Sequence, residues 1–210
     1  MLKYLLALIR FFVGGLFIFS GLIKVNDPVG TAIKMEEYFD VFAADIAGFF
    51  SAFKLFSLEI AVILVVAEVV LGVMLLVGAR LRFTVYALGA MVLFFTFLTF
   101  YSAYFNKVTD CGCFGDAIKL TPWQSFYKDV VLLVLIGVLF LYRRELPSSS
   151  PTWAIWTTRI CTLLSILIAI TAINTLPFID FRAYKEGVNI PEAMLPSAPL
   201  QYAYINGKRR

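Results

Sequence analysis

The sequence contains no histidine and few charged residues. Asp, Glu, Lys and Arg together make up 15% of its 210 residues. The missing histidine excludes Ser-His-Asp triads, histidine general bases and His-ligated zinc or haem from this chain. Charged residues make up about 25% of an ordinary soluble domain, so their scarcity argues against a water-soluble enzyme.

Apolar residues take the place of the missing charges. The set AVILMFWYC makes up 61% of the chain, against about 45–50% in soluble domains. Five apolar runs are each long enough to cross about 30 Å of hydrocarbon as a helix; they cover about residues 4–23, 58–77, 83–105, 123–142 and 153–176. The runs are continuous rather than alternating, which excludes a β-barrel. The sequence therefore predicts an all-α integral membrane protein.

Basic residues at the ends of these runs predict the orientation. Arg80 and Arg82 lie in the short turn after the second run, and Arg143 and Arg144 follow the fourth. Cytoplasmic loops are rich in Lys and Arg, so we expect the amino terminus inside and the carboxyl terminus outside. The net charge of +4 thus reflects topology and does not indicate nucleic-acid binding. Lys3 leaves one alternative, that the first run is a cleaved signal peptide.

This topology divides the chain into three parts. We expect residues 1–145 to hold four spans and residues 146–178 to hold the fifth with its inner loop. Residues 179–210 would form an extracytoplasmic tail or the start of a truncated outer domain. Residues 24–57 form a Phe-rich outer segment, for which we expect one or two short helices lying on the membrane surface. A second outer segment, residues 106–122, carries two of the three cysteines.

Small and charged residues inside the first two spans predict how these helices meet. Gly14 and Gly21 lie on one stripe of the first span, and Gly72 lies in the second; such residues allow close helix packing. Glu68 is near the middle of its span, where a charge is costly and needs a partner. We expect Arg10 to be that partner, because its long side chain can bridge the difference in depth. A protonated Glu68 bonded to a backbone carbonyl is the alternative.

Two cysteines form a Cys-x-Cys turn. Gly112 separates Cys111 from Cys113, and together with Gly115 it permits the unusual dihedral angles of so tight a ring. Loop closure would contribute only about 1.6 kcal/mol to such a disulfide, and strained exposed disulfides are labile. The turn therefore favours thiol–disulfide exchange on the oxidising side of the membrane, although a structural disulfide or reduced thiols stay open. Cys161 lies in the fifth span, where we expect it to act as a small hydrophobe.

Charged neighbours of the turn would tune its thiols. Asp110 and Asp116 would raise a thiol pKa, and Lys119 would lower it. The two aspartates are also the nearest groups that could complete a metal site, and without histidine we predict none. The chain has neither a Cys-x-x-Cys motif nor a second outer cysteine pair, so an electron relay through two pairs is not expected.

Together these motifs resemble the MauE branch of the DoxX-like membrane proteins. The likeness covers about residues 1–142 and rests on the Cys-Gly-Cys-Phe-Gly turn of residues 111–115, on Arg10, Gly14, Phe17, Ser20, Gly21 and Lys24, and on Glu68, Gly72 and Gly78. It implies a four-helix membrane core, to which the fifth span is an addition. It also implies a role in methylamine utilisation, where MauE proteins help to mature a disulfide-rich amine dehydrogenase subunit. Some DoxX relatives belong to a quinone-reducing oxidoreductase, so the resemblance leaves quinone open as a cofactor.

These inferences lead to one main expectation and two alternatives. We expect a protein of a bacterial inner membrane, embedded in lipid, whose Cys111 and Cys113 exchange disulfides with a thioredoxin-like protein or an exported client. That activity would make it a thiol–disulfide oxidoreductase. The first alternative is a non-enzymatic assembly or transport factor with a structural disulfide, and the second is a quinone-linked oxidoreductase subunit.

Overall fold

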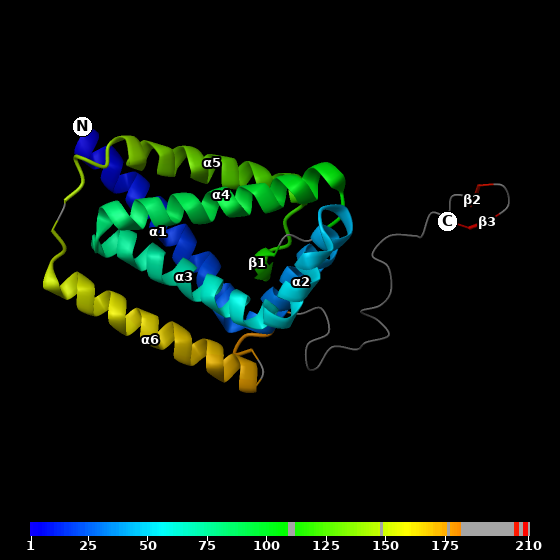
Figure 1. Ribbon diagram of the computed structural model, residues 1–210. Helices are drawn as coiled ribbons and strands as arrows, with labels where there is room; N and C mark the ends of the chain where they lie inside the picture. Colours follow the sequence, from blue (N-terminus) through cyan, green and yellow to red (C-terminus); the bar gives the residue numbers. More distant parts are fainter. Residues whose placement is uncertain (109–111, 148, 176, 182–203, 206–207, 210) are drawn as a thin grey trace. The chain divides into compact units, whose positions relative to one another are not determined.

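A computed structural model describes residues 1–108, 112–147, 149–175, 177–181, 204–205 and 208–209 (Figure 1). Met1–Ile179 forms one compact unit, and Asp180–Arg210 forms a second. The described part of the second unit includes strands β2 (Tyr204–Ile205) and β3 (Lys208–Arg209), which pair in antiparallel fashion.

The first unit is built from helices. In chain order these are α1 (Leu2–Asn26), α2 (Pro28–Asp45), the 3-10 helix η1 (Gly48–Phe56), α3 (Ser57–Val77), α4 (Leu81–Phe105), α5 (Pro122–Leu141) and α6 (Thr152–Asn174), with the short strand β1 (Cys113–Asp116) between α4 and α5. Five segments are long and apolar enough to cross a membrane, namely Leu2–Asn26, Gly48–Val77, Leu81–Phe105, Pro122–Leu141 and Thr152–Asn174. The prediction of an all-α, five-span membrane protein is confirmed.

Local sequence explains where several helices begin and end. Asp27 accepts a hydrogen bond from the Gly30 backbone N–H, and Pro28 supplies the fixed φ that suits a first helical position. Thr121 opens α5 with a reciprocal capping box to Gln124. Gly78 ends α3 in the left-handed conformation, with φ of 81°.

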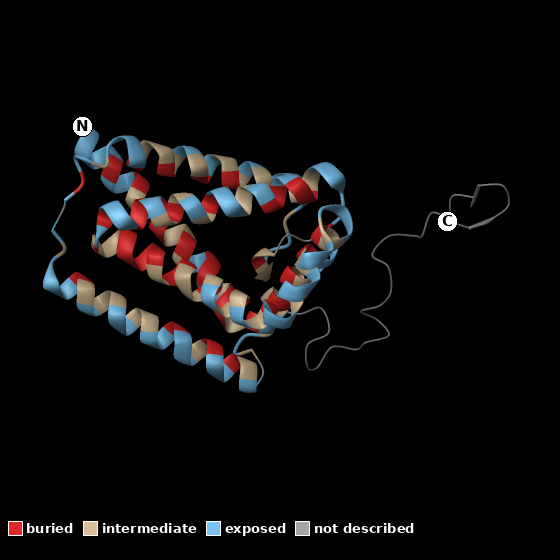
Figure 2. Cartoon of the chain, viewed as in Figure 1, coloured by how far each residue is buried: buried red, intermediate tan, exposed pale blue. Residues whose placement is uncertain are grey.

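Helices α1, α3, α4 and α5 surround a common core. α1 packs along α3 and α4 packs along α5, while α6 lies against α3 and α1 (Figure 1). The centre holds fully buried aliphatic side chains, including Val13, Leu75, Leu88 and Leu139. Figure 2 shows buried positions on the facing sides of these helices and exposed ones on their outer sides. Many exposed positions are large and apolar, such as Leu8, Phe11, Leu93, Val134 and Leu163. This outward apolar surface is what contact with a lipid bilayer requires.

The Phe-rich segment of residues 24–57 is largely helical, as predicted, and contains the whole of α2 and η1. α2 packs on α3 through Ala32, Met35 and Ala61. Tyr38 and Phe42 of α2 also belong to an apolar cluster that includes residues of α4. α2 therefore covers one end of the four-helix core. Its location at the membrane surface stays a prediction.

A candidate functional site: the polar cavity beneath the cysteine turn

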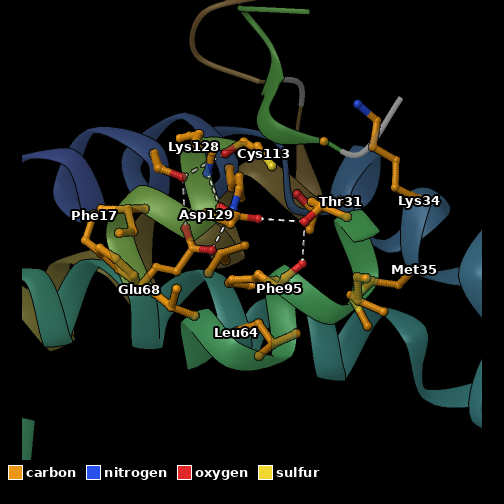
Figure 3. Close-up of a pocket in the computed structure, with 18 of the residues that line it drawn as sticks. Phe17, Thr31, Lys34, Met35, Leu64, Glu68, Phe95, Cys113, Lys128 and Asp129 are labelled. Carbon is orange, nitrogen blue, oxygen red and sulfur yellow. Dashed lines mark hydrogen bonds and ion pairs between the residues drawn. The ribbon is translucent and has the colours of Figure 1, made fainter. Parts of the chain in front are cut away.

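Charged side chains converge in a cavity under β1, at the end of the core that α2 covers. The cavity has a volume of about 70 Å³. A buried water needs about 10–15 Å³ of such space, so several waters or the reactive end of a peptide side chain would fit. Its charged and thiol lining residues are Lys24, Lys34, Glu68, Cys113, Lys128 and Asp129. Figure 3 shows Cys113, Lys128 and Asp129 facing the same space from β1 and α5.

A buried ion pair joins α1 to α3 on the floor of this cavity. Lys24 Nζ lies 2.6 Å from Glu68 Oε1, and the two side chains are only 8% and 3% exposed. The second carboxylate oxygen of Glu68 lies 3.2 Å from Ser20 Oγ. The Lys24 ammonium also stands 5.1 Å from the centre of the Phe95 ring. A buried charge is tolerated when it is paired and hydrogen-bonded, and Glu68 meets that condition through Lys24.

The predicted contact between Arg10 and Glu68 was wrong. Arg10 Nε and Nη2 donate to the Leu75 carbonyl oxygen at 3.1 and 2.9 Å, and Nη2 lies 3.3 Å from the Leu76 carbonyl oxygen. These carbonyls belong to the last turn of α3, where backbone oxygens lack helical partners. Leu76 lies about 12 Å along the helix from Glu68. Arg10 therefore caps α3, and Lys24 is the cation that meets Glu68.

The three glycines that were expected to aid packing lie where α1 meets α3. A Cβ atom added at Gly72 would stand 2.9 Å from the Gly14 carbonyl oxygen, and one added at Gly21 would stand 2.6 Å from Val69 Cγ2. These contacts fix the register of the two helices. That register brings Lys24, one turn beyond Gly21, to Glu68.

A second ion pair, in which only the carboxylate is fully buried, comes from adjacent residues of α5. Lys128 Nζ lies 2.6 Å from Asp129 Oδ1, and the Asp129 side chain is 3% exposed. Thr99 Oγ1 of α4 donates to the other carboxylate oxygen of Asp129 at 3.0 Å. Lys128 Nζ also stands 5.4 Å from the centre of the Phe114 ring. The sequence reasoning did not single out this pair, although two charged residues in an otherwise apolar span were an available signal.

Cys113 brings a thiol to this polar cavity. It is half-buried and free, and its carbonyl oxygen accepts a hydrogen bond from Ser20 Oγ at 2.8 Å. Burial raises the pKa of the Cys113 thiol; Lys128 opposes this rise, Asp129 adds to it and Lys24 opposes it. Cys111 and Asp110 lie outside the described residues. Cys161, on α6, is also half-buried and free, but it packs among apolar residues.

The other residues expected to tune the thiol lie away from it. Asp116 pairs with Lys34 at 3.1 Å, which links β1 to α2. Lys34 also lies over Gly112, since a Cβ atom added there would stand 2.6 Å from Lys34 Cδ. Lys119 is exposed and does not line the cavity. The cation that acts most on Cys113 is therefore Lys128, because α5 begins at Pro122 and turns that side chain inward.

The first prediction concerns the pH at which the Cys113 thiol ionises. It is tested on a chain that carries Cys111→Ser and Cys161→Ser, so that Cys113 is its one remaining thiol. Because maleimides react with the thiolate, we expect the alkylation rate of the folded protein to reach its midpoint above the ordinary thiol pKa of about 8.5. A raised pKa means that the folded protein favours the neutral thiol. The contribution of this thiol to the free energy of unfolding is therefore fully present below the ordinary pKa, and it is lost as the pH rises through the pKa of the folded protein. Lys128→Met should move the midpoint higher still.

Lys119→Met is the matched control for this titration, since it removes an exposed lysine from the same part of the chain. We expect it to leave the midpoint unchanged. A midpoint at the value of the unfolded chain, or an equal response to the two lysine substitutions, would contradict the electrostatic assignment.

Comparisons with known proteins found one matching protein family and one similar curated protein. A family model described as "Methylamine utilisation protein MauE" matches residues 2–142, which include α1, α3, α4 and α5. The chain is also similar to "Protein TlpB" of Flavobacterium psychrophilum, with 28% identity over 175 residues. That alignment covers 79% of this chain and 44% of the relative, so the chain spans less than half the length of TlpB. No solved structure matches the chain.

Proposed function

The chain belongs to the MauE family of membrane proteins, and on that premise we propose that it exchanges disulfides with a partner protein through Cys111 and Cys113. One observation carries the proposal: the Cys113 thiol lines a cavity that also holds one buried and one partly buried ion pair. A purely structural disulfide would have no need of buried charges beside its sulfur, and burying them is costly. Lysines near a thiol favour its reactive thiolate, and Lys128 and Lys24 act on Cys113 in that direction, against the effect of burial.

The exchange proceeds in two balanced steps. A client thiolate attacks the Cys111 sulfur of the oxidised pair, which forms a mixed disulfide and releases Cys113 as a thiolate. A second client thiolate then attacks the client sulfur of the mixed disulfide. The client leaves with a new disulfide, and the pair keeps two electrons and takes up two protons. The reverse sequence reduces a client disulfide and reoxidises the pair.

Lys128 and Lys24 assist the release of Cys113 in this scheme. A leaving thiol departs faster when its pKa is lower, whereas burial raises the pKa of Cys113. The two ammonium groups offset that penalty by stabilising the thiolate. Asp129 and Glu68 hold these ammonium groups at 2.6 Å, so the cations are in place before the exchange begins.

We also propose that the turn faces the outside of a bacterial inner membrane. Arg82, Arg143 and Arg144 flank the end of α4 and α5 remote from Cys113, which suits a cytoplasmic location for that end. The turn would then meet exported proteins or a thioredoxin-like partner on the oxidising side. The family description suggests methylamine utilisation as the setting. The disulfide-rich amine dehydrogenase subunit implied by the family resemblance would then be a client.

Trapping of the mixed disulfide tests this function. In the reducing direction, we expect the Cys111 thiolate of Cys113→Ser to attack a client disulfide and form a mixed disulfide, which persists because no Cys113 thiol remains to attack the Cys111 sulfur and release the client. Cells expressing this variant should therefore accumulate a covalent complex, seen on non-reducing gels and identified by mass spectrometry after acid quenching. Cys111→Ser should accumulate none, and both variants should lose exchange entirely.

Cys161→Ser is the matched control, because it removes a free thiol that does not line the cavity. It should behave like the native chain. Failure of Cys113→Ser to form any mixed disulfide, together with a native pair that resists mild reductant, would instead support the structural disulfide of a non-enzymatic assembly factor.

A further inference from the structure

Three arginines converge at the end of the bundle remote from Cys113. Arg82 lies in the first turn of α4, and Arg143 and Arg144 directly follow α5. Together with Tyr86 they line one pocket. In the part of the chain that the structure describes, none of the three guanidinium groups has a carboxylate partner. The pocket therefore brings together three positive charges, none of them in an ion pair with a carboxylate of the described residues.

Phe140 packs against two of the residues that line this pocket. The Arg143 guanidinium stands 4.5 Å from the centre of the Phe140 ring, and its Nη1 donates to the Phe140 carbonyl oxygen at 2.9 Å. Tyr86 packs edge-on against the same ring, with the centroids 5.1 Å apart. Arg143 is thus held in place, while Arg82 and Arg144 are exposed at the rim. Arginine in such an arrangement suits a phosphate group, which it binds through paired N–H donors.

The surroundings of the arginines favour a lipid phosphate over a free one. Phe83, Leu141 and Tyr142 are 60%, 72% and 42% exposed beside them. A ligand that meets cations and apolar side chains together at the end of membrane-spanning helices has a charged head and apolar chains. Basic pockets between spanning helices bind anionic lipid headgroups in this way.

We propose that this pocket binds the phosphate of an anionic phospholipid, with its acyl chains against the neighbouring apolar side chains. The bound headgroup bridges the start of α4 and the end of α5, where Arg82 and Arg144 would otherwise repel each other. This site is separate from the cysteine cavity and does not depend on disulfide exchange.

Native mass spectrometry of the full chain in detergent tests the site. The protein is mixed with equal amounts of phosphatidylglycerol and phosphatidylcholine, and the retained lipid is measured. We expect the native chain to prefer phosphatidylglycerol, and Arg82→Gln with Arg144→Gln to reduce that preference about tenfold. Lys54→Gln with Lys119→Gln removes two charges elsewhere and should leave the preference intact.

Three results would overturn the proposal. These are equal retention of the two lipids by the native chain, an unchanged preference in the double arginine variant, and displacement of the lipid by millimolar inorganic phosphate. The last result would assign the pocket to free phosphate. An unchanged helical circular dichroism spectrum shows that the variants remain folded, and Arg143→Gln provides an independent variant within the same pocket.

Discussion

Replacing Lys24 by alanine is expected to lower the free energy of unfolding by about 3–5 kcal/mol, because it leaves a buried carboxylate without its counter-charge. Glu68 is 2% exposed and lies 2.6 Å from the ammonium group that the substitution removes. The apolar side chains around it cannot supply a replacement charge. The measurement is unfolding of the purified chain by a denaturing detergent, followed by circular dichroism.

An exposed ion pair provides the comparison. Lys54 Nζ lies 2.8 Å from Asp40 Oδ1, but the two side chains are 37% and 61% exposed. Lys54→Ala should therefore cost less than about 1 kcal/mol. The double variant Lys24→Met with Glu68→Leu should recover most of the loss, because apolar residues of similar volume often replace a buried pair without penalty. If Lys24→Ala cost no more than Lys54→Ala, Glu68 would be protonated, as the sequence also allowed.

The sequence was sufficient to predict the spanning helices but not their side-chain partners. Long continuous apolar runs have one stable form in a bilayer, in which every backbone group is bonded within its own helix. That constraint is local, so the five spans were found, four of them within a few residues of their bounds; the second apolar segment begins earlier than predicted, at Gly48, because it includes η1. The contact of Arg10 depends instead on the register between α1 and α3. Gly14 and Gly72 set this register, and it places Arg10 beside the carbonyls that end α3.

The cavity also could not be predicted from local sequence patterns. Lys128 was less conspicuous in the sequence than Lys119, which is closer to the cysteines along the chain. The distance of a lysine from the cysteines along the chain does not show which way its side chain points. The capping box at Thr121 fixes where α5 begins, and this turns the Lys128 side chain toward Cys113. The cover of the cavity comes from α2, which the sequence suggested only as a surface helix. A site enclosed by several separate elements becomes visible only once they are packed.

Replacing Gly72 by leucine is expected to separate α1 from α3 and to lower the free energy of unfolding by about 3 kcal/mol. A Cβ atom at this position would stand 2.9 Å from the Gly14 carbonyl oxygen and 3.0 Å from the Ile18 backbone nitrogen. Both are backbone atoms of a packed helix, so neither can turn aside as a side chain could. The same detergent unfolding measures the loss.

Gly15 offers a matched control, because it lies next to Gly14 on α1 and an added Cβ there would meet nothing within 4 Å. Gly15→Leu should be neutral or should stabilise the chain by up to about 1 kcal/mol, since leucine forms helices better than glycine.

The separation caused by Gly72→Leu should also pull Lys24 away from Glu68. In the double variant, Lys24→Ala should then cost less than it does alone, with a coupling of about 0.5–3 kcal/mol. Strictly additive losses would contradict the argument that helix contact at the glycines sets the register for the buried pair.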